Sequence, residues 1–468
     1  MANITLNVNH MMKDFMGEKG LAREDMEKLY PALENAYKAV EAGRGKGMQG
    51  WMDLPYNQEE IIADVEKAAA EIKAKFDAFV VLGIGGSALG PAAVQQALNH
   101  LHYNELPKEK RCAPKLYIED NIDPERMAAL LDVIDVKTTC FNVISKSGGT
   151  AETMSQYLIV LEKLKAACPN DYQSHIVVTT SKTKGFLIEL AKKEGFKTFY
   201  IPDGVGGRFS ELCPVGLLAA AVCNIDIRAL VAGAKKMDQR CASGNAAQNV
   251  ALYEAGLMYL CMQKGYNMSV MMPYADSLKL ISDWYAQLWA ESLGKNVTLD
   301  GKKCNVGSTP VKTLGVTDQH SQLQLYTEGP YDKAITFLKV ASFRAETPIP
   351  HGCEDVPKIA FLGGKSHNEL IDAERRGTEY ALYKSGRMSQ TITLDEVNAD
   401  TVGQLLYFIE LVTAYTGALL NIDTFNQPGV EESKVAAYAV MGYESEEHNA
   451  KRAEMQNRPA EKAEYIFE

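Results

Sequence analysis

The chain has 468 residues, of which 46% are hydrophobic and 23% are charged, and these values predict a globular protein with two major domains. Its formal net charge of −11 argues against nucleic acid and anionic membranes as partners, because like charges repel. A phosphorylated ligand would be repelled as well, so a pocket for one must supply its own local positive potential.

Cysteine usage and the N-terminal sequence both predict a cytoplasmic protein. The nine cysteines are scattered without a CxxC pair, which indicates reduced thiols instead of a disulfide framework or a zinc cluster. The start, MANITLNVNHMMKD, lacks the basic and apolar stretches of a secretory signal. The most apolar run, from Leu212 to Cys223, is shorter than the ~20 residues that span a bilayer and is predicted to be a buried helix.

Helices are predicted for residues 1–75, where apolar residues recur at spacings of three and four. A glycine-rich break interrupts them at Gly43 to Gly50. From residue 76 to residue 230, short β-branched runs alternate with helical stretches, which predicts right-handed βαβ crossovers and a parallel sheet. The expected strands are Ala78–Leu82, Lys115–Ile118, Cys140–Ile144 and His175–Thr179.

A second α/β domain is predicted for residues 267–425, after connecting helices at 231–266. Its expected strands are Met268–Met272, Ala334–Leu338 and Lys358–Leu362, with an amphipathic helix from Asp276 to Leu293. Residues 426–468 predict a helical C-terminal arm. The predicted fold class is therefore α/β, with two parallel-sheet αβα sandwich domains and helical segments at both ends.

The first motif with chemical meaning is VVLGIGGSALGPAAV, a strand followed by glycines and a helix. Glycines allow backbone N–H groups to approach an anion, and the start of the helix adds its positive dipole end. Gly83-x-Gly85-x-x-Ala88 also fits a relaxed dinucleotide fingerprint. The acidic residues Glu119 and Asp120, however, lie more than 30 positions beyond Gly85, where ~20 are expected. A tight turn without a ligand has the same pattern.

The second motif, FNVISKSGGTAET, again joins an apolar strand to a helix. Three hydroxyl residues and two glycines gather between them, an arrangement that suits a phosphate monoester, and Lys146 adds a cation. Ordinary helix N-caps are the alternative. The GxxxxGK[ST] pattern is absent, so nucleotide hydrolysis is not supported.

Five motifs in the same order resemble the glucose-6-phosphate isomerase family of the bacterial type. They are GIGGSALG from residue 83, GVGGRFSELCPVGLLAAAV from 204, QLWAESLGK from 287, TDQHSQLQLYTEGP from 317 and QPGVEESK from 427. The resemblance implies two sugar-isomerase (SIS-type) domains and reversible conversion of glucose 6-phosphate to fructose 6-phosphate through a cis-enediolate, in glycolysis and gluconeogenesis. Two departures are a phosphate loop poorer in threonine, with Ser147, Gly148 and Gly149, and Leu293 where the family often has asparagine.

The resemblance assigns Glu291 as the base that moves a proton between C1 and C2. From the residues alone, Gln287 and Glu291 lie four apart on a predicted helix and share a face, although a solvated glutamate at a helix end has the same pattern. Arg208 precedes a buried helix and needs a partner, either an enediolate oxygen or a structural carboxylate.

His320 is implied as the acid/base for ring opening, since imidazole titrates near neutrality, although a lone histidine can equally be structural. In the family this histidine comes from the neighbouring subunit, so a homodimer is expected. Lys434 would assist at the ring or at the C1 and C2 oxygens. The implied substrate-binding residues are Gly86, Ser87, Ser145, Lys146, Ser147, Thr150, Glu152 and Gln287.

No metal or organic cofactor is expected. His100 and His102 are two apart, a spacing that does not direct both to one ion on a helix, and HExxH is absent. The alternatives left open are a bifunctional glucose/mannose-6-phosphate isomerase, a non-catalytic phosphosugar-binding module and an NAD enzyme.

Overall fold

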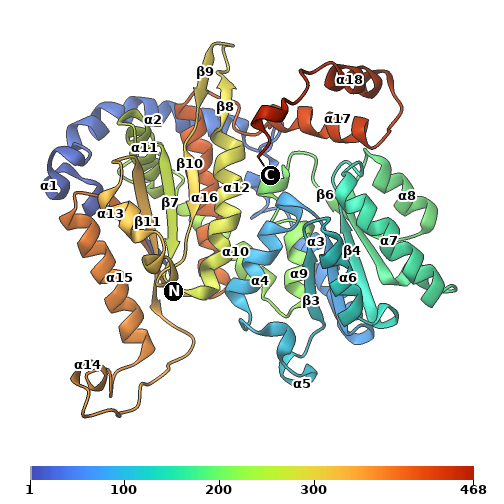
Figure 1. The fold of residues 1–468 in the computed structure, drawn as a ribbon, viewed down its shortest axis with the longest axis horizontal. Helices are drawn as coiled ribbons and strands as arrows, with labels where there is room; N and C mark the ends of the chain where they lie inside the picture. The colour runs from blue at the N-terminus through green and yellow to red at the C-terminus, as the bar shows by residue number, and fades with distance from the viewer. Residues whose placement is uncertain (1–2, 468) are drawn as a thin grey trace. The chain divides into compact units, whose positions relative to one another are not determined.

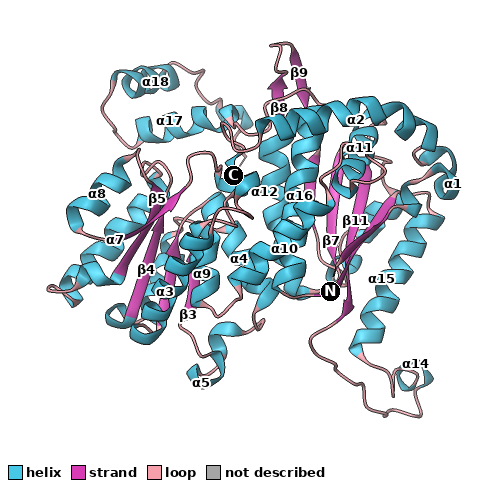
Figure 2. Cartoon of the chain, turned by 180° about the vertical axis from the view of Figure 1, so that it is seen from behind, coloured by secondary structure: helices cyan, strands magenta, loops and turns pink. Residues whose placement is uncertain are grey.

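The computed structural model describes residues 3–467 and divides into two compact units, residues 1–424 and residues 425–468. The first unit contains two five-stranded sheets (Figures 1 and 2). Helix α16 (Ala399–Leu419) is the one helix, among the described residues, long and apolar enough to cross a membrane. Because 89% of its apolar window is buried inside the protein, it has the character of a core helix.

The first sheet is entirely parallel, with strand order β3-β2-β4-β5-β6. Its strands are β2 (Ala78–Leu82), β3 (Lys115–Glu119), β4 (Thr139–Ile144), β5 (Ile176–Ser181) and β6 (Lys197–Ile201). The four strands predicted for this region are confirmed. Every residue of β2, β4 and β5 is buried, which explains why these strands are near-continuous apolar or β-branched runs.

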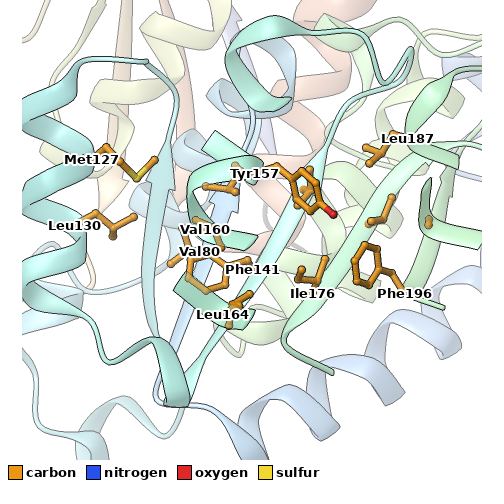
Figure 3. Packing of buried hydrophobic residues seen from close by; sticks show 14 residues of the cluster. Val80, Met127, Leu130, Phe141, Tyr157, Val160, Leu164, Ile176, Leu187 and Phe196 are labelled. Atoms are coloured by element: carbon orange, nitrogen blue, oxygen red, sulfur yellow. The ribbon is translucent and has the colours of Figure 1, made fainter. Parts of the chain in front are cut away.

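Helices cover both faces of this sheet. On one face lie α6 (Pro124–Val133), α7 (Ala151–Ala167) and α8 (Phe186–Glu194), whose apolar residues form one core with the strands. Figure 3 shows Val160 and Leu164 of α7 close to Val80 and Phe141. On the other face lie α3 (Glu59–Lys75), α4 (Leu89–Leu98) and α9 (Pro214–Val222), and α9 packs on both α3 and α4. Helix α9 is the predicted buried apolar run, and all its residues are buried.

The connections of the first sheet reverse direction between β2 and β4. From β2 the chain passes through α4 to β3 on one side, and then returns through α6 to β4 on the other side of β2. In open α/β sheets, the carboxyl ends of two such strands form the crevice in which ligands bind. The two loops that the sequence predicts to hold phosphate follow β2 and β4, so they flank this crevice.

The second sheet has strand order β1-β12-β11-β7-β10. Its strands are β1 (Ile4–Asn7), β7 (Met268–Pro273), β10 (Thr309–Lys312), β11 (Lys333–Ser342) and β12 (Ser389–Glu396). All pairs are parallel except the one between β1 and β12. The segment 1–75, predicted to be helical, therefore also supplies the antiparallel edge strand β1. This strand has only four residues, too few for its alternating pattern to be recognised in the sequence.

The strand predicted at Lys358–Leu362 is wrong. Those residues form α14 (Pro357–Ala360) and a following turn, on a segment that projects away from the sheet in Figure 1. Ile359 and Phe361 are 50% and 60% exposed, so their apolar character does not reflect burial in a sheet. Among the strands that were not predicted, β12 begins with the buried polar residues Ser389, Gln390 and Thr391, whose composition hides it.

Helix α12 (Lys279–Leu293) joins the two halves of the first unit. It packs on α4 of the first half and on α16 and β7 of the second. The predicted helix Asp276–Leu293 is thus confirmed, with a 3₁₀ turn as its first three residues. The other helices of this unit are α1 (Lys13–Met16), α2 (Arg23–Gly43), α5 (Lys108–Arg111), α10 (Ile227–Arg240), α11 (Val250–Gln263), α13 (Leu323–Glu328) and α15 (His367–Lys384).

Two smaller elements complete the structure. A two-stranded ribbon, β8 (Lys295–Val297) and β9 (Lys303–Val306), follows α12 directly. The second compact unit contains α17 (Glu431–Val440) and α18 (Glu446–Gln456), which pack on each other.

Candidate active site

The loop after β2 is in backbone contact with the loop that carries Arg208. Both loops are 3₁₀ turns, Gly85–Ser87 and Gly207–Phe209. A Cβ on Gly86 would lie 2.1 Å from the carbonyl carbon of Gly207, so only glycine permits this approach. Ser210 stabilises the turn Gly207–Phe209, because its hydroxyl donates to the carbonyl of Gly207 at 2.6 Å. The first and second family motifs therefore form one wall.

Helix α12 brings the predicted base to this wall. Gly85 has a positive φ of 57°, and a Cβ there would lie 3.0 Å from Nε2 of Gln287. That amide nitrogen donates to Oε1 of Glu291 at 2.9 Å. Oε1 of Gln287 is buried and has no hydrogen-bond partner in the described part of the chain. A buried acceptor without a donor is costly, so a ligand hydroxyl at this position would satisfy it.

Arg208 contacts the same carboxylate. Its Nη1 donates to Oε2 of Glu291 at 3.2 Å, its Nε donates to Oγ of Ser292 at 2.8 Å, and its Nη2 donates to the carbonyl of Thr424 at 2.7 Å. The Arg208 side chain is 3% exposed and that of Glu291 is 33% exposed. Burial lowers the pKa of Arg208 from its ordinary value, and the nearby Glu291 opposes that shift.

The sequence left open whether Arg208 pairs with a substrate oxygen or with a protein carboxylate. In this structure it pairs with a carboxylate, and that carboxylate is the predicted base. The structure thus brings together Gly86, Arg208, Gln287 and Glu291, which come from three motifs far apart in the sequence.

The loop after β4 gathers its hydroxyl groups at the N-terminus of α7. Oγ of Ser145 lies 2.9 Å from Oγ1 of Thr150 and accepts from the backbone N–H of Gly148 at 3.0 Å, and Oγ of Ser147 accepts from the N–H of Gly149 at 3.2 Å. Thr150 occupies the N-cap position of α7, but its side chain makes no capping hydrogen bond. The ordinary capping role is therefore not realised, and the N-terminus of this 17-residue helix can receive an anion.

Lys146 connects the loop after β4 to the segment that precedes Arg208. Its ammonium group donates to the carbonyls of Asp203 and Val205, at 2.7 and 2.8 Å. Val205 lies three residues before Arg208 in the chain. Burial lowers the pKa of Lys146. This lysine therefore braces the wall of the site through backbone carbonyls while it contributes positive charge beside the phosphate loop.

Four of the predicted site residues remain to be placed, namely Ser87, Glu152, His320 and Lys434. Ser87, next to Gly86, and Glu152, in the first turn of α7, are half-buried. His320 ends a 3₁₀ turn beyond β10 and is exposed. Within residues 3–467 no hydrogen bond or ion pair joins His320 to Glu291 or Arg208. Lys434 lies on α17 in the second compact unit, where it is exposed and pairs with Glu431 at 2.8 Å.

Two residues of the cluster, Ser292 and Lys295, were not predicted from the sequence. Ser292 accepts from Arg208, and Lys295 donates to the carbonyls of Glu291 and Ser292. Both belong to the motif QLWAESLGK, in which only the glutamine and glutamate received a role. The motif alone does not indicate that Lys295, so close to Glu291, is buried.

Comparisons with known proteins identify the family of the chain. The model of the phosphoglucose isomerase family matches residues 59–457. A glucose-6-phosphate isomerase of Carboxydothermus hydrogenoformans is 51% identical over 441 residues, which cover 94% of this chain and 95% of that protein.

Solved structures give the same result for the fold. A hypothetical protein of Thermus thermophilus has a TM-score of 0.84 at 35% identity, covering 94% of this chain and all of that one. A glucose-6-phosphate isomerase of Chlamydia trachomatis, 20% identical, has a TM-score of 0.82, covers 97% of this chain and 92% of its own, and so shares the fold. On the extent of the family match and the identity to its relatives, the chain belongs to the phosphoglucose isomerase family.

Proposed function

We infer that the chain catalyses the reversible isomerisation of glucose 6-phosphate to fructose 6-phosphate, the aldose–ketose interconversion that serves glycolysis and gluconeogenesis. The observation that carries this inference is the Glu291 carboxylate, which is contacted by Arg208 and Gln287 next to the loop after β2. One side chain there can move a proton, and the neighbouring loops can hold a phosphate.

The phosphate group binds at the loop after β4. Ser145, Ser147 and Thr150 supply hydroxyl donors, and the uncapped amides of α7 supply N–H donors and the positive end of the helix dipole. The chain as a whole has a net charge of −11 and would repel a phosphate. Lys146, held in place by the carbonyl of Asp203, supplies the local positive charge that attracts it. Gly86, Ser87 and Glu152 complete the wall around the sugar.

Glu291 acts as the base that removes a proton from C2 of the open-chain aldose and returns it to C1. A carboxylate is a suitable base for this step, and Arg208 and Gln287 hold this one in place. Arg208, held by hydrogen bonds to Glu291, Ser292 and Thr424, stabilises the negative charge that develops on the enediolate oxygens. The buried Oε1 of Gln287 accepts from a sugar hydroxyl.

Ring opening requires an acid/base, which we assign to His320 of the partner subunit in a homodimer. Two observations support this assignment. Gln319, beside His320, is held by Tyr274 and Glu374, at 2.7 and 3.0 Å, so His320 is displayed on a fixed turn and still exposed. In addition, the projecting segment around α14 exposes apolar Val356, Ile359 and Phe361, as expected of a surface that a second copy covers.

A mixing experiment tests the shared site. Glu291→Gln and His320→Ala are each expected to be nearly inactive, but subunits exchanged between them should form mixed dimers with one intact site. We expect the mixture to regain at least 10% of wild-type activity, because each chain supplies what the other lacks. If the mixture stays as inactive as its components while native mass spectrometry, with an affinity tag on one variant, shows mixed dimers, His320 does not act across the interface.

Lys434 is assigned, on the motif QPGVEESK alone, to assist at the ring oxygen or at O1 and O2.

We place the protein in the cytoplasm, in keeping with its scattered free cysteines, of which Cys140, Cys213, Cys223, Cys241 and Cys261 are buried.

Ser147→Ala tests the phosphate loop. We expect KM to rise about fivefold to tenfold, the effect of losing ~1 kcal/mol of hydrogen bonding, while kcat stays within threefold of wild type. This follows because phosphate contacts are made in both the ground state and the transition state. Ser155→Ala, one turn along α7 at an exposed position, is the matched control and should leave both constants unchanged. A fall in kcat at constant KM would remove Ser147 from the phosphate site.

The inferred activity itself is tested with the purified full-length chain and fructose 6-phosphate, without added metal or nucleotide. Quenched samples should contain glucose 6-phosphate, approaching the same ratio from either direction. Parallel incubation with mannose 6-phosphate separates the bifunctional alternative, because only that enzyme would convert it.

A further inference from the structure

Lys295 is a buried lysine next to the proposed base. It begins β8, two residues after α12 ends at Leu293, and it is 8% exposed. Its ammonium group donates to the carbonyl of Glu291 at 2.6 Å and to the carbonyl of Ser292 at 2.9 Å. No carboxylate lies within ion-pair distance of it among the described residues.

These contacts have a local physical explanation. The last carbonyl groups of a helix have no intrahelical partner, and a cation at this end is favoured by the helix dipole. Only the N–H of Gly294, which donates to the carbonyl of Ala290 at 3.0 Å, continues the helical pattern past Leu293. Lys295 satisfies the next two carbonyls and so fixes the last turn of α12.

That last turn carries both groups that Arg208 contacts on this helix. Ser292 accepts from Nε of Arg208 and Glu291 accepts from Nη1. A shift of the turn would therefore move the base and would break the two bonds that orient the guanidinium. Displacement of a reacting group by ~1 Å can cost ~100-fold in rate.

We propose that Lys295 is a positioning residue for the isomerisation, which holds the carboxylate of Glu291 and the guanidinium of Arg208 in one geometry through the backbone of Glu291 and Ser292. The proposal rests on the inferred isomerase activity and assigns to Lys295 no contact with substrate. Its role is separate from binding, so its removal should affect kcat far more than KM.

The electrostatic surroundings of Lys295 connect this role to pH. Burial lowers the pKa of Lys295 to about 8, and the cation of Arg208 acts in the same direction. The carboxylates of Asp423, which follows α16, and of Glu291, on α12, oppose the shift. Above this pH the ammonium group loses its charge and its hold on the helix carbonyls weakens. We therefore expect kcat to decline as the pH rises through 8.

Two variants and one control test the proposal. For Lys295→Met we expect kcat to fall about 100-fold with KM within threefold of wild type. Lys295→Arg keeps a cation at all relevant pH values, so it should recover at least tenfold over Lys295→Met. Its kcat should remain level from pH 7.5 to pH 9.5, where the wild type declines. Lys333→Met, at a lysine of the second sheet that is also 8% exposed, should retain wild-type kcat.

The outcomes separate this proposal from the inferred function. An inactive wild type would overturn the isomerase assignment, whatever the variants do. With an active wild type, the positioning role is overturned if Lys295→Met keeps kcat within threefold, or if Lys333→Met loses as much. Should Lys295→Met fail to fold by circular dichroism, Lys295→Arg decides alone: an alkaline decline near pH 8 that persists in this variant contradicts the proposal.

Discussion

Glu291→Gln is expected to lower kcat by about 10²–10⁴-fold, the contribution of a positioned general base, while phosphosugar affinity stays within threefold of wild type. Glutamine has nearly the shape of glutamate and can keep a hydrogen bond with Gln287, but it cannot accept a proton at neutral pH. The phosphate loop after β4 is on separate elements, so binding is preserved. Titration calorimetry with fructose 6-phosphate measures the affinity, and quenched assays measure kcat.

Isotope exchange makes this prediction specific to the proton transfer. In D2O, the wild type should incorporate deuterium at C1 or C2 of the sugar, and Glu291→Gln should incorporate essentially none over the same time. Glu328→Gln, an exposed glutamate on α13, serves as the matched control and should exchange at the wild-type rate. If Glu291→Gln exchanges label nearly as fast as the wild type, another residue is the base.

Glu254→Gln is expected to remove a large pH dependence of stability from the second half of the first unit. Glu254 lies on α11 and is buried against β12, where one carboxylate oxygen accepts from Gln390 and the other has no partner among the described residues. Burial raises the pKa of Glu254 from an ordinary 4.5 to about 8, although the hydrogen bond from Gln390 opposes the shift. The folded chain therefore holds this proton up to about pH 8, while the unfolded chain releases it near pH 4.5.

The sign follows from proton linkage. Between pH 4.5 and 8 the folded state binds more protons at this group than the unfolded state, so the stability of the wild type falls as the pH rises through this window. The amide of Glu254→Gln does not titrate. The advantage of the variant over the wild type in free energy of unfolding should thus grow by roughly 4–5 kcal/mol from pH 4.5 to pH 8.

Urea unfolding at a series of pH values and one protein concentration measures this difference. The exposed Glu162, on α7, provides the control Glu162→Gln, whose difference from wild type should be independent of pH. A stability difference for Glu254→Gln that stays constant from pH 4.5 to 8 would show that Glu254 is ionised in the folded protein.

Three strands of the first sheet, β2, β4 and β5, could be predicted from sequence because they are buried on both faces. β2, β4 and β5 contain apolar or β-branched runs bounded by polar loops, and this pattern is seldom ambiguous. β12 escaped prediction because it uses buried Ser389, Gln390 and Thr391, which pack through hydrogen bonds, and composition alone does not distinguish such residues from a loop. The apolar run at Lys358–Leu362 was wrongly predicted to be a buried strand, because its apolar residues are in fact exposed on a projecting segment.

For the site, motifs identified residue types, whereas the topology determined which of them meet. The loops after β2 and β4 could be predicted to hold an anion, but their adjacency depends on the reversal of chain direction between these strands. The pairing of Arg208 with Glu291 and the buried position of Lys295 needed three dimensions, because 83 residues separate the first two. The roles of His320 and Lys434 remain predictions from motifs.

The most direct test of the account is incubation of the purified wild-type chain with fructose 6-phosphate in D2O, followed by proton NMR of the product. We predict that glucose 6-phosphate appears and that a fraction of it carries deuterium at C2, because a single protein carboxylate exchanges with solvent during transfer. The account is contradicted if no glucose 6-phosphate forms.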